Sequence, residues 1–257
     1  ERIMGGQVCS CGEEENELRQ EEKFTFADGS VYTGAFQGGL QHGLGTQVWP
    51  DGGRYTGQWA KGKAHGQGRY EHPDGDVYIG GWQEDQAHGT GLYIHTDGSR
   101  YEGQFAFDRQ HGEGVECWPD GATFTGQYRD GFKHGHGRFQ WSDGSHYEGS
   151  FEQNDLHGYG VYSWKGGRWH KGWWLNNRMH GDGEFYWPDG RSYRGQYQED
   201  MKDGKGIFHW PDGRSYDGQW RMGLQHGRGR YTSSEGVTRA GEWYEGKRKQ
   251  WLSESEL

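Results

Sequence analysis

The sequence has 257 residues, among them 50 glycines, 14 tryptophans, 16 tyrosines and 11 phenylalanines. Disordered and collagen-like chains do not carry aromatic side chains at 16%, so we expect a folded protein that packs around rings. With 28 basic against 38 acidic residues the net charge is -10, which gives no electrostatic reason to bind nucleic acid or anionic lipid directly.

The first segment, residues 1–23, is acidic and has no strand pattern, so we expect a mobile tail. If translation starts at Met4, the run from Gly5 resembles an N-myristoylation signal followed by palmitoylation at Cys9 and Cys11. A glycine that follows a methionine by chance is the alternative, and Cys9 stands where such a signal prefers Ser or Thr. Acyl chains at these positions would attach the chain to a membrane.

A repeat of 23 residues begins at Tyr32 and continues without insertion or deletion to residue 238, which gives nine full repeats. A half repeat precedes it from Phe24, and a partial repeat follows it. We therefore predict one array over 24–248 and a polar tail over 249–257. A repeat this short cannot bury an apolar face alone and must stack on its neighbours.

Each repeat predicts two strands. An aromatic residue, a glycine and a second aromatic residue alternate at its start, as in 55–59, and a period of two indicates a strand. The eighth residue is Gly, Asp or Asn, as at Gly62; these tolerate a left-handed backbone and predict a turn. A second alternating run then ends near an Asp-Gly pair such as Asp74-Gly75, a hairpin signal that leads into the next repeat.

The expected fold class is all-β: an elongated single antiparallel sheet of stacked 23-residue hairpins. Eighteen strands at about 4.8 Å spacing would give a sheet roughly 85 Å long. One face carries rings that lie on glycines, as with Tyr78, Gly80 and Trp82, and the opposite face is mostly polar. Aromatic–glycine packing therefore replaces an aliphatic core.

The pattern over 55–59, followed by Gly62, by 65–68 and by Asp74-Gly75, resembles the MORN (membrane occupation and recognition nexus) repeat. The resemblance implies a curved sheet of β-hairpins that serves as a scaffold in cytoskeletal, ciliary and membrane-junction assemblies. In some lipid kinases and methyltransferases such repeats are an accessory region, and that role would require a further domain.

Candidate chemistry is sparse. A histidine stands before the paired glycines in eight repeats, from His42 to His226, and Asp203 takes its place in the remaining one. Equivalent positions lie two strands apart, about 9.5 Å, whereas nitrogens that share one zinc each lie about 2 Å from it. We expect turn hydrogen bonds for these histidines, no metal and no cofactor. The residues outside the array are too few for a catalytic core, so we predict no enzyme activity.

One repeat departs from the pattern. His170 replaces its opening tyrosine, and Trp169 and Trp173 stand where other repeats have mainly small or polar residues. Alternation places both tryptophans on the polar face with Lys171 between them. Local repacking is one interpretation. The other is an aromatic anchor for a partner or a second copy, which makes Trp169, Lys171 and Trp173 candidate partner-binding residues.

These features favour a non-catalytic scaffold that binds protein partners, held at a membrane by an acylated N-terminus and linked to cytoskeletal or signalling components. The alternative is a structural subunit of a ciliary or axonemal assembly without membrane attachment. Cys117 lies far from the other two cysteines, so the three cannot all pair, which indicates a cytoplasmic location. A homodimer stays open, and no apolar run reaches the roughly 18 residues of a membrane-spanning helix.

Overall fold

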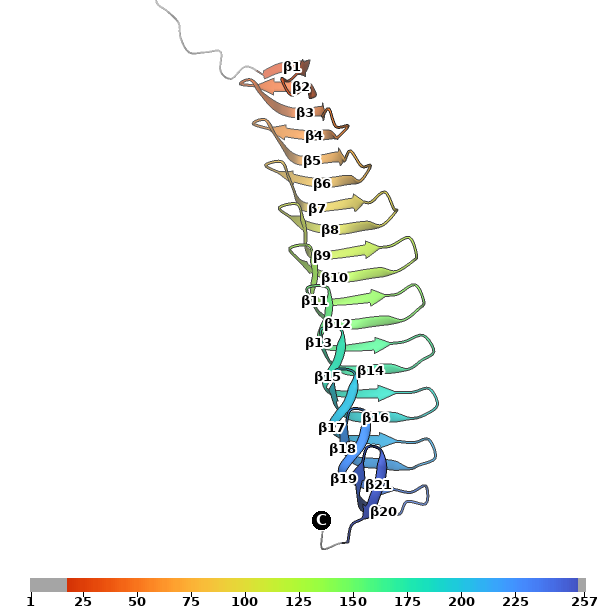
Figure 1. Ribbon diagram of the computed structural model, residues 1–257. Helices are drawn as coiled ribbons and strands as arrows, with labels where there is room; N and C mark the ends of the chain where they lie inside the picture. Colours follow the sequence, from red (N-terminus) through yellow and green to blue (C-terminus); the bar gives the residue numbers. More distant parts are fainter. Residues whose placement is uncertain (1–17, 254–257) are drawn as a thin grey trace, which may run out of the picture. The chain divides into compact units, whose positions relative to one another are not determined.

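The computed structural model describes residues 18–253. All regular structure in this range is β: an open antiparallel sheet of 21 strands in which consecutive strands form hairpins (Figure 1). The strands are β1 (Leu18–Thr25), β2 (Val31–Gln37), β3 (Leu40–Val48), β4 (Arg54–Ala60), β5 (Lys63–Glu71), β6 (Val77–Gln83), β7 (Gln86–Ile94), β8 (Arg100–Ala106), β9 (Arg109–Cys117), β10 (Thr123–Arg129), β11 (Phe132–Gln140), β12 (His146–Glu152), β13 (Asp155–Ser163), β14 (Trp169–Leu175), β15 (Arg178–Tyr186), β16 (Ser192–Gln198), β17 (Met201–His209), β18 (Ser215–Arg221), β19 (Leu224–Thr232), β20 (Thr238–Tyr244) and β21 (Lys247–Trp251). No helix in 18–253 is long and apolar enough to cross a membrane.

The predicted fold class is confirmed, and the sheet divides into two compact units, of which the first ends at His111 and the second starts at Gly112. Each full repeat contributes a strand of seven residues and a strand of nine, as β4 and β5 do. The strand β1 begins at Leu18, before the array boundary predicted at Phe24, and pairs with β2. Main-chain hydrogen bonds form such a ladder, so it needs no side-chain pattern that the sequence could reveal.

The turn within each repeat is a two-residue hairpin loop with left-handed backbone at both positions. Lys61 has φ 52° and Gly62 has φ 80°, and the corresponding pair in the next repeat, Glu84 and Asp85, has φ 51° and 70°. Positive φ at both central residues is the type I′ turn, whose twist matches that of the strands it joins. The predicted turn is therefore confirmed, and it includes the residue before the predicted one.

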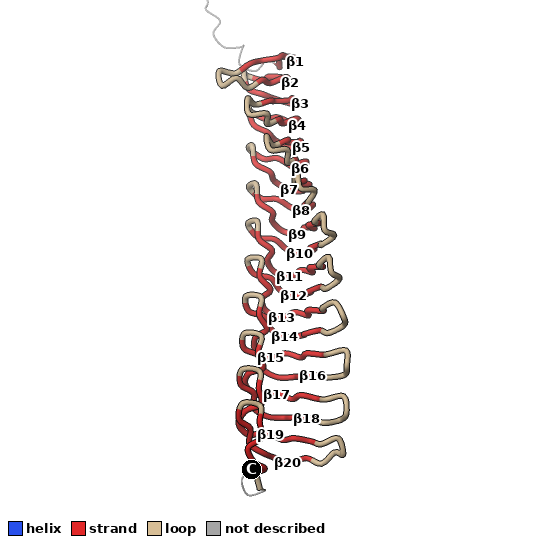
Figure 2. The backbone as a smooth tube through the Cα atoms, turned by 45° about the vertical axis from the view of Figure 1, so that its right-hand side comes forward, coloured by secondary structure: helices blue, strands red, loops and turns tan. Residues whose placement is uncertain are grey.

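The connection between repeats is longer. The N–H of Gly52 donates to the carbonyl of Trp49 at 3.0 Å, and the N–H of Gly53 donates to Asp51 Oδ1 at 2.9 Å. Gly52 has φ 96°, a backbone conformation that favours glycine. The Asp-Gly pair thus closes a hairpin as predicted, through a wider loop than a two-residue turn. Figure 2 shows the two kinds of loop at opposite ends of the strands.

The core is formed by a column of buried aromatic side chains, each packed over glycine residues of the strands. Tyr55, at 1% exposure, lies over Gly57 and Gly68, where an added Cβ would come within 2.6 Å of its hydroxyl. The same hydroxyl donates to the carbonyl of Gln58 at 2.9 Å. The ring meets Trp59 edge-on at 5.1 Å. The opening residues of the repeats are Tyr32, Tyr55, Tyr78, Tyr101, Phe124, Tyr147, His170, Tyr193 and Tyr216, and all are buried.

In most repeats the eighth residue also joins the repeat to the preceding one, a contact we name the inter-repeat clip. The N–H of Asp85 donates to the carbonyl of Ala64 at 3.1 Å, and Asp85 Oδ1 accepts from the N–H of Ala64 at 2.7 Å. The same two bonds join Asp108 to Ala87, Asn154 to Lys133, Asn177 to Leu156 and Asp200 to Met179. Gly62, Gly223 and Gly246 make the backbone bond of the clip, to Gln41, Lys202 and Gln225.

Candidate functional site

The predicted partner-binding residues lie together on β14. Burial alternates along this strand: His170 and Trp174 are buried, while Lys171 and Trp173 are exposed. Trp173 is 51% exposed. Trp169 faces the same side but is half-buried, because its ring stacks on Tyr186 at 5.8 Å. The structure therefore gives local packing to Trp169 and an open surface to the other two.

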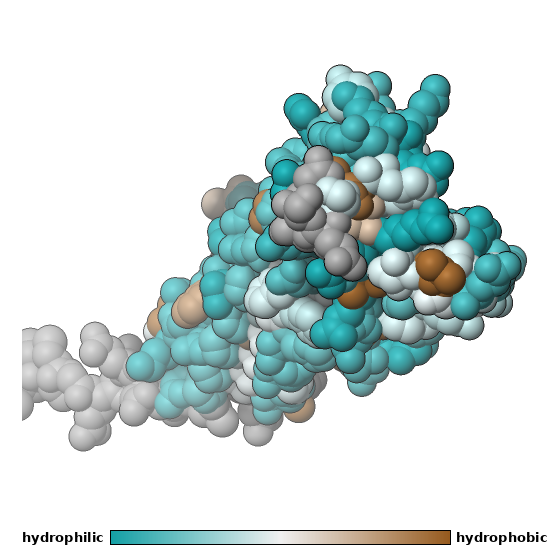
Figure 3. Space-filling view, turned by 90° about the horizontal axis from the view of Figure 1, so that it is seen from below, coloured by the Kyte–Doolittle hydropathy of each residue, from teal (hydrophilic) through white to brown (hydrophobic). Residues whose placement is uncertain are grey.

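A shallow depression of about 600 Å³ lies beside Lys171 and Trp173. The ring of Tyr159, on the neighbouring strand β13, meets Trp173 edge-on at 5.9 Å. Arg194 and Glu184 form an ion pair of 3.4 Å within the same depression. We name this surface, formed by Tyr159, Lys171, Trp173, Glu184 and Arg194, the Trp173 face. The surface view in Figure 3 is mainly hydrophilic, with hydrophobic side chains in small separate patches.

Tyr159 is a site residue that the sequence reasoning missed. It pairs directly with Trp173 across the two strands. The signal was present, because Tyr159 stands between Gly158 and Gly160, where other repeats have mostly polar residues. Two aromatic side chains opposite each other on one face of an antiparallel pair are expected to be in contact.

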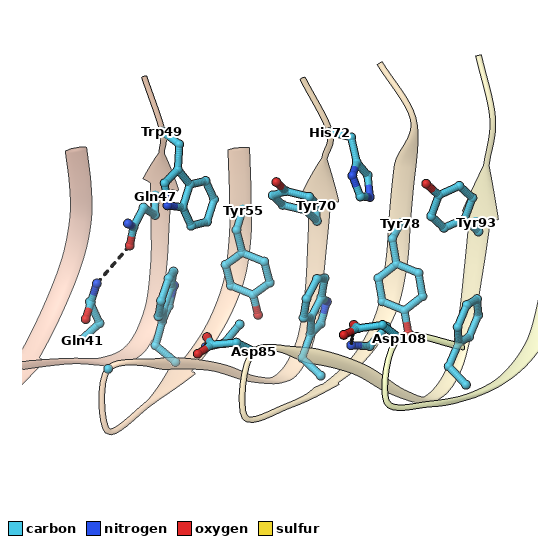
Figure 4. A pocket seen from close by; sticks show the side chains of 16 residues that line it. Gln41, Gln47, Trp49, Tyr55, Tyr70, His72, Tyr78, Asp85, Tyr93 and Asp108 are labelled. Carbon is cyan, nitrogen blue, oxygen red and sulfur yellow. Dashed lines mark hydrogen bonds between the residues drawn. The ribbon is translucent and has the colours of Figure 1, made fainter. Parts of the chain in front are cut away.

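A second site lies in the first unit, on the face that carries the buried rings. It is a groove of about 640 Å³, shown from close by in Figure 4. We name it the aromatic groove. It is lined by Gln41, Gln47, Trp49, Tyr55, Trp59, Gly62, Ala64, Tyr70, His72, Tyr78, Trp82, Asp85, Ala87, Tyr93, Phe105 and Asp108.

The groove exists where the tenth residue of a repeat is short. Ala64 and Ala87 hold this position in two successive repeats. In the seven other repeats the position carries a longer side chain: Gln41, Gln110, Lys133, Leu156, Met179, Lys202 and Gln225. In the first repeat Gln41 Nε2 donates to Gln47 Oε1 at 3.0 Å and closes this end of the groove (Figure 4).

Two carboxylates border the groove. Asp85 and Asp108 are held by their clips to Ala64 and Ala87, and Figure 4 shows each beside the hydroxyl end of a tyrosine. Burial, followed by the charge of Asp85, raises the pKa of Tyr55 above its ordinary value of 10. Burial and the charge of Asp108 raise the pKa of Tyr78 in the same way. At neutral pH the groove therefore presents ring faces, neutral hydroxyls and negative charge.

The histidine column makes different contacts from repeat to repeat. His157 Nε2 lies 3.4 Å from Glu152, His88 packs against Phe107, and His226 lies beside the ring of Tyr244. Each stands at the start of the irregularity in its strand pair, where the following glycine has positive φ, as at Gly66. Within residues 18–253 no three His, Cys, Asp or Glu side chains gather as metal ligands would.

The predicted lipidation residues Gly5, Cys9 and Cys11 lie outside the described residues.

Comparison with known proteins identifies the repeats. The family model for the MORN repeat matches nine consecutive segments, 32–54, 55–77, 78–100, 101–123, 124–146, 147–168, 170–190, 193–213 and 216–238. A search of curated proteins finds no significant match.

Among solved structures, the chain is similar to the TCP10 domain of Danio rerio CPAP in complex with a peptide of Danio rerio STIL. The identity is 14% and the TM-score 0.49, over 91% of this chain and 99% of that one. A second structure of the wild-type TCP10 domain of Danio rerio CPAP matches at 16% identity and a TM-score of 0.42, over 80% of this chain and 97% of that one. The likeness concerns the fold alone.

Proposed function

Since the chain belongs to the MORN repeat family, we propose that it is a non-catalytic scaffold that binds protein partners. Repeat sheets of this kind present extended surfaces rather than one enclosed site. The two sites described above offer rings, charges and hydrogen-bonding groups for binding.

The exposed side chain of Trp173 carries the proposal. An indole that is 51% exposed, with Tyr159 against it and Lys171 two residues away, adds nothing to the buried ring column on the opposite face. Tryptophan, tyrosine and arginine are the residues that most often dominate protein–protein binding energy, and Arg194 belongs to the same face. We propose the Trp173 face as the surface that docks a protein partner.

The test is photo-cross-linking in cells. A photoreactive phenylalanine analogue placed at position 173 should capture a discrete partner, and the Lys171→Glu change should abolish this adduct. The matched control is the same analogue at position 107, since Phe107 is also exposed (66%) but lies in a hairpin loop. Equal adducts from both positions, or an adduct insensitive to Lys171→Glu, would remove this face from the proposal.

We further propose that acyl chains on Gly5, Cys9 and Cys11 hold the scaffold at a membrane, where it links the membrane to cytoskeletal or signalling components. One myristoyl chain binds a bilayer only weakly, so a second acyl chain is needed for stable attachment. In a chain translated from Met4, Gly5→Ala should release the protein into the cytosol, and Cys9→Ser with Cys11→Ser should leave it weakly bound.

The alternative is a structural subunit of a ciliary or axonemal assembly without membrane attachment. Intact mass of the native protein separates the two proposals. Acyl adducts on residues 5–11 support the anchored scaffold, and an unmodified chain that co-purifies with axonemes supports the structural subunit.

A further inference from the structure

Two lysines of this chain lie in aromatic cages. Lys202 Nζ lies 4.4 Å from the ring centroid of Phe208, 4.7 Å from Trp220, 5.1 Å from Tyr193 and 5.5 Å from Trp187. An ammonium within about 6 Å of a ring centroid is attracted by the electron-rich face of the ring.

Lys133 is surrounded by rings in a similar way, and its Nζ also pairs with Glu116 Oε2 at 2.7 Å. Its Nζ lies 4.9 Å from the ring of Trp118 and 5.1 Å from that of Phe124, with Tyr128 and Phe139 within 6.0 Å. Both lysines are the tenth residue of a repeat. Repeats of this sequence therefore form ammonium cages at that position.

The aromatic groove contains two such cages without a lysine. The rings around Lys202 come from the residues 15 and 9 positions before it and 6 and 18 positions after it. The same offsets from Ala64 give Trp49, Tyr55, Tyr70 and Trp82; from Ala87 they give His72, Tyr78, Tyr93 and Phe105. All eight side chains line the groove. The cage walls are kept, and only the internal occupant is missing.

The empty cages carry a carboxylate at the clip position, where the filled cages carry none; in the Lys133 cage Glu116 supplies a carboxylate from another position, 2.7 Å from the ammonium. The clip residue next to Lys133 is Asn154, and the one next to Lys202 is Gly223. Next to Ala64 and Ala87 it is Asp85 and Asp108. A carboxylate beside a ring cage offsets the cost of burying an ammonium that comes from another molecule, whereas a neutral amide or a glycine does not.

Lys202 illustrates the value of such a charge. Burial among the rings and repulsion from Arg191 lower its pKa to about 8. The clip position beside Lys202 is Gly223 and supplies no carboxylate to offset this cost. A lysine ammonium in the cages at Ala64 and Ala87 would lie near Asp85 or Asp108, whose carboxylates favour its charged form.

We infer that the aromatic groove binds two lysine side chains of an extended basic segment of a partner protein, one in the cage at Ala64 and one in the cage at Ala87. The inference rests on the proposed function in that the ligand is a protein. The net charge of -10 favours a basic segment over a second copy of this chain.

The spacing of the cages specifies the conformation of the segment. Equivalent positions of successive repeats are two strands apart, about 9.5 Å. A polyproline II helix rises about 3.1 Å per residue with three residues per turn, so side chains at i and i+3 point the same way about 9.3 Å apart. In a β-strand, residues i and i+3 point to opposite sides. The expected ligand is therefore Lys-x-x-Lys in the polyproline II conformation.

The probe is a fluorescein-labelled peptide with two lysines three positions apart and no other charged side chains. Its binding to the full chain is followed by fluorescence anisotropy at low salt. Replacing both lysines by norleucine, which keeps the stem and removes the ammonium, should weaken binding at least about tenfold. A peptide of the same charge with adjacent lysines should bind clearly less tightly, because only one cage can then be filled.

Substitutions taken from the chain's own repeats test the site on the protein. Ala64→Met with Ala87→Met fills both cages as Met179 fills its own repeat, and should weaken binding about tenfold or more. Asp85→Asn with Asp108→Asn keeps the clip, as Asn154 and Asn177 do, and should weaken binding of the lysine peptide but not of the norleucine peptide. Thermal unfolding of each variant checks that the fold is kept.

Wild-type affinity in the double Met variant, or equal affinity for the adjacent-lysine peptide, would overturn the inference, because bulk charge would then explain the binding. The control Lys171→Glu should leave peptide binding unchanged. If the peptide fails to bind while position 173 still captures its partner, the lysine site is wrong and the scaffold stands. If the adduct fails while the peptide binds through the cages, the Trp173 face is wrong and the lysine site stands.

Discussion

Replacing His170 by tyrosine should stabilise the protein. His170 is fully buried in the column of opening residues, and among the described residues neither ring nitrogen has a hydrogen-bond partner. In the neighbouring repeats Tyr147 and Tyr193 donate their hydroxyls to the carbonyls of Ser150 and Gln196, both at 3.0 Å. The shorter imidazole supplies no such hydroxyl.

The expected gain at neutral pH is about 2 kcal/mol in the free energy of unfolding. A hydrogen bond contributes about 1 kcal/mol, and removing a buried polar group without a partner contributes about 1 kcal/mol or more. The ring has room, because Gly172 and Gly183 provide the same bed beneath His170 that glycines provide beneath the tyrosines. The hydroxyl should reach the carbonyl of Trp173, the position equivalent to Ser150.

The gain should increase in acid. Burial lowers the pKa of His170 from 6.5 to about 4, so the unfolded chain binds a proton that the folded chain does not bind between these values. The wild type is therefore fully stable with respect to this group above pH 6.5 and loses stability as the pH falls toward 4. The loss is about 2 kcal/mol near pH 5 and about 3 kcal/mol when complete. His170→Tyr should not show this loss.

Hydrogen exchange of the β14 amides at about pH 7.5 and pH 5 is the suitable assay, because repeat arrays can unfold in parts. Phe124→Tyr is the matched control: it adds the same hydroxyl to the same column without removing a titratable group, so its effect should not depend on pH in this range. A variant His170→Tyr that loses as much stability as the wild type between the two pH values would refute the assignment of the acid loss to this histidine.

Three further predictions concern stability and are measured by urea unfolding. Gly57→Ala should lower the free energy of unfolding by several kcal/mol, since the new Cβ would lie 2.5 Å from the Cα of Gly68. Gly39→Ala is the control: it has open space around it and φ 76°, and should cost only about 1 kcal/mol. Equal costs would contradict the packing of rings on glycines. Asp85→Ala should lower the free energy of unfolding by about 2 kcal/mol, because the side-chain bond of the clip is lost and alanine tolerates the left-handed backbone poorly. Asp85→Asn should be nearly neutral. A harmless Asp85→Ala would show that the clip adds no stability. Lys202→Met should raise the free energy of unfolding by about 1 kcal/mol at neutral pH. This gain should shrink as the pH rises from 8 toward 10.5, because the wild-type lysine then loses the charge that is costly to bury. A gain independent of pH would contradict this cause.

The sequence predicted the repeat, its two strands and both hairpin connections because these depend on local residue types. The turn at Gly62 follows from the backbone freedom of glycine alone. The clip could not be predicted in this way: Asp85 has one role as a turn residue and a second toward Ala64, 21 residues earlier, and only the stacking of repeats brings the two together.

The two candidate sites were predictable to different degrees. Trp173 departs from its repeat by being large, and that signal was found. The aromatic groove departs from the other repeats because the side chains of Ala64 and Ala87 are short. The space that a short side chain leaves can be recognised only by comparison with a repeat in which a longer side chain fills it. Lys202 provides that comparison, but its cage is formed by three successive repeats and is seen only in the structure.

The inter-repeat clip has a direction. In every described pair the later repeat supplies the turn that fastens the earlier one, as Asp85 fastens Ala64 and Gly246 fastens Gln225. During synthesis from the N-terminus, the newest repeat to leave the ribosome is therefore always unfastened until its successor emerges. The partial repeat that contains Gly246 makes the clip to the ninth repeat. A nascent chain that stops before β20 would therefore expose a hairpin with unpaired backbone groups to chaperones and proteases.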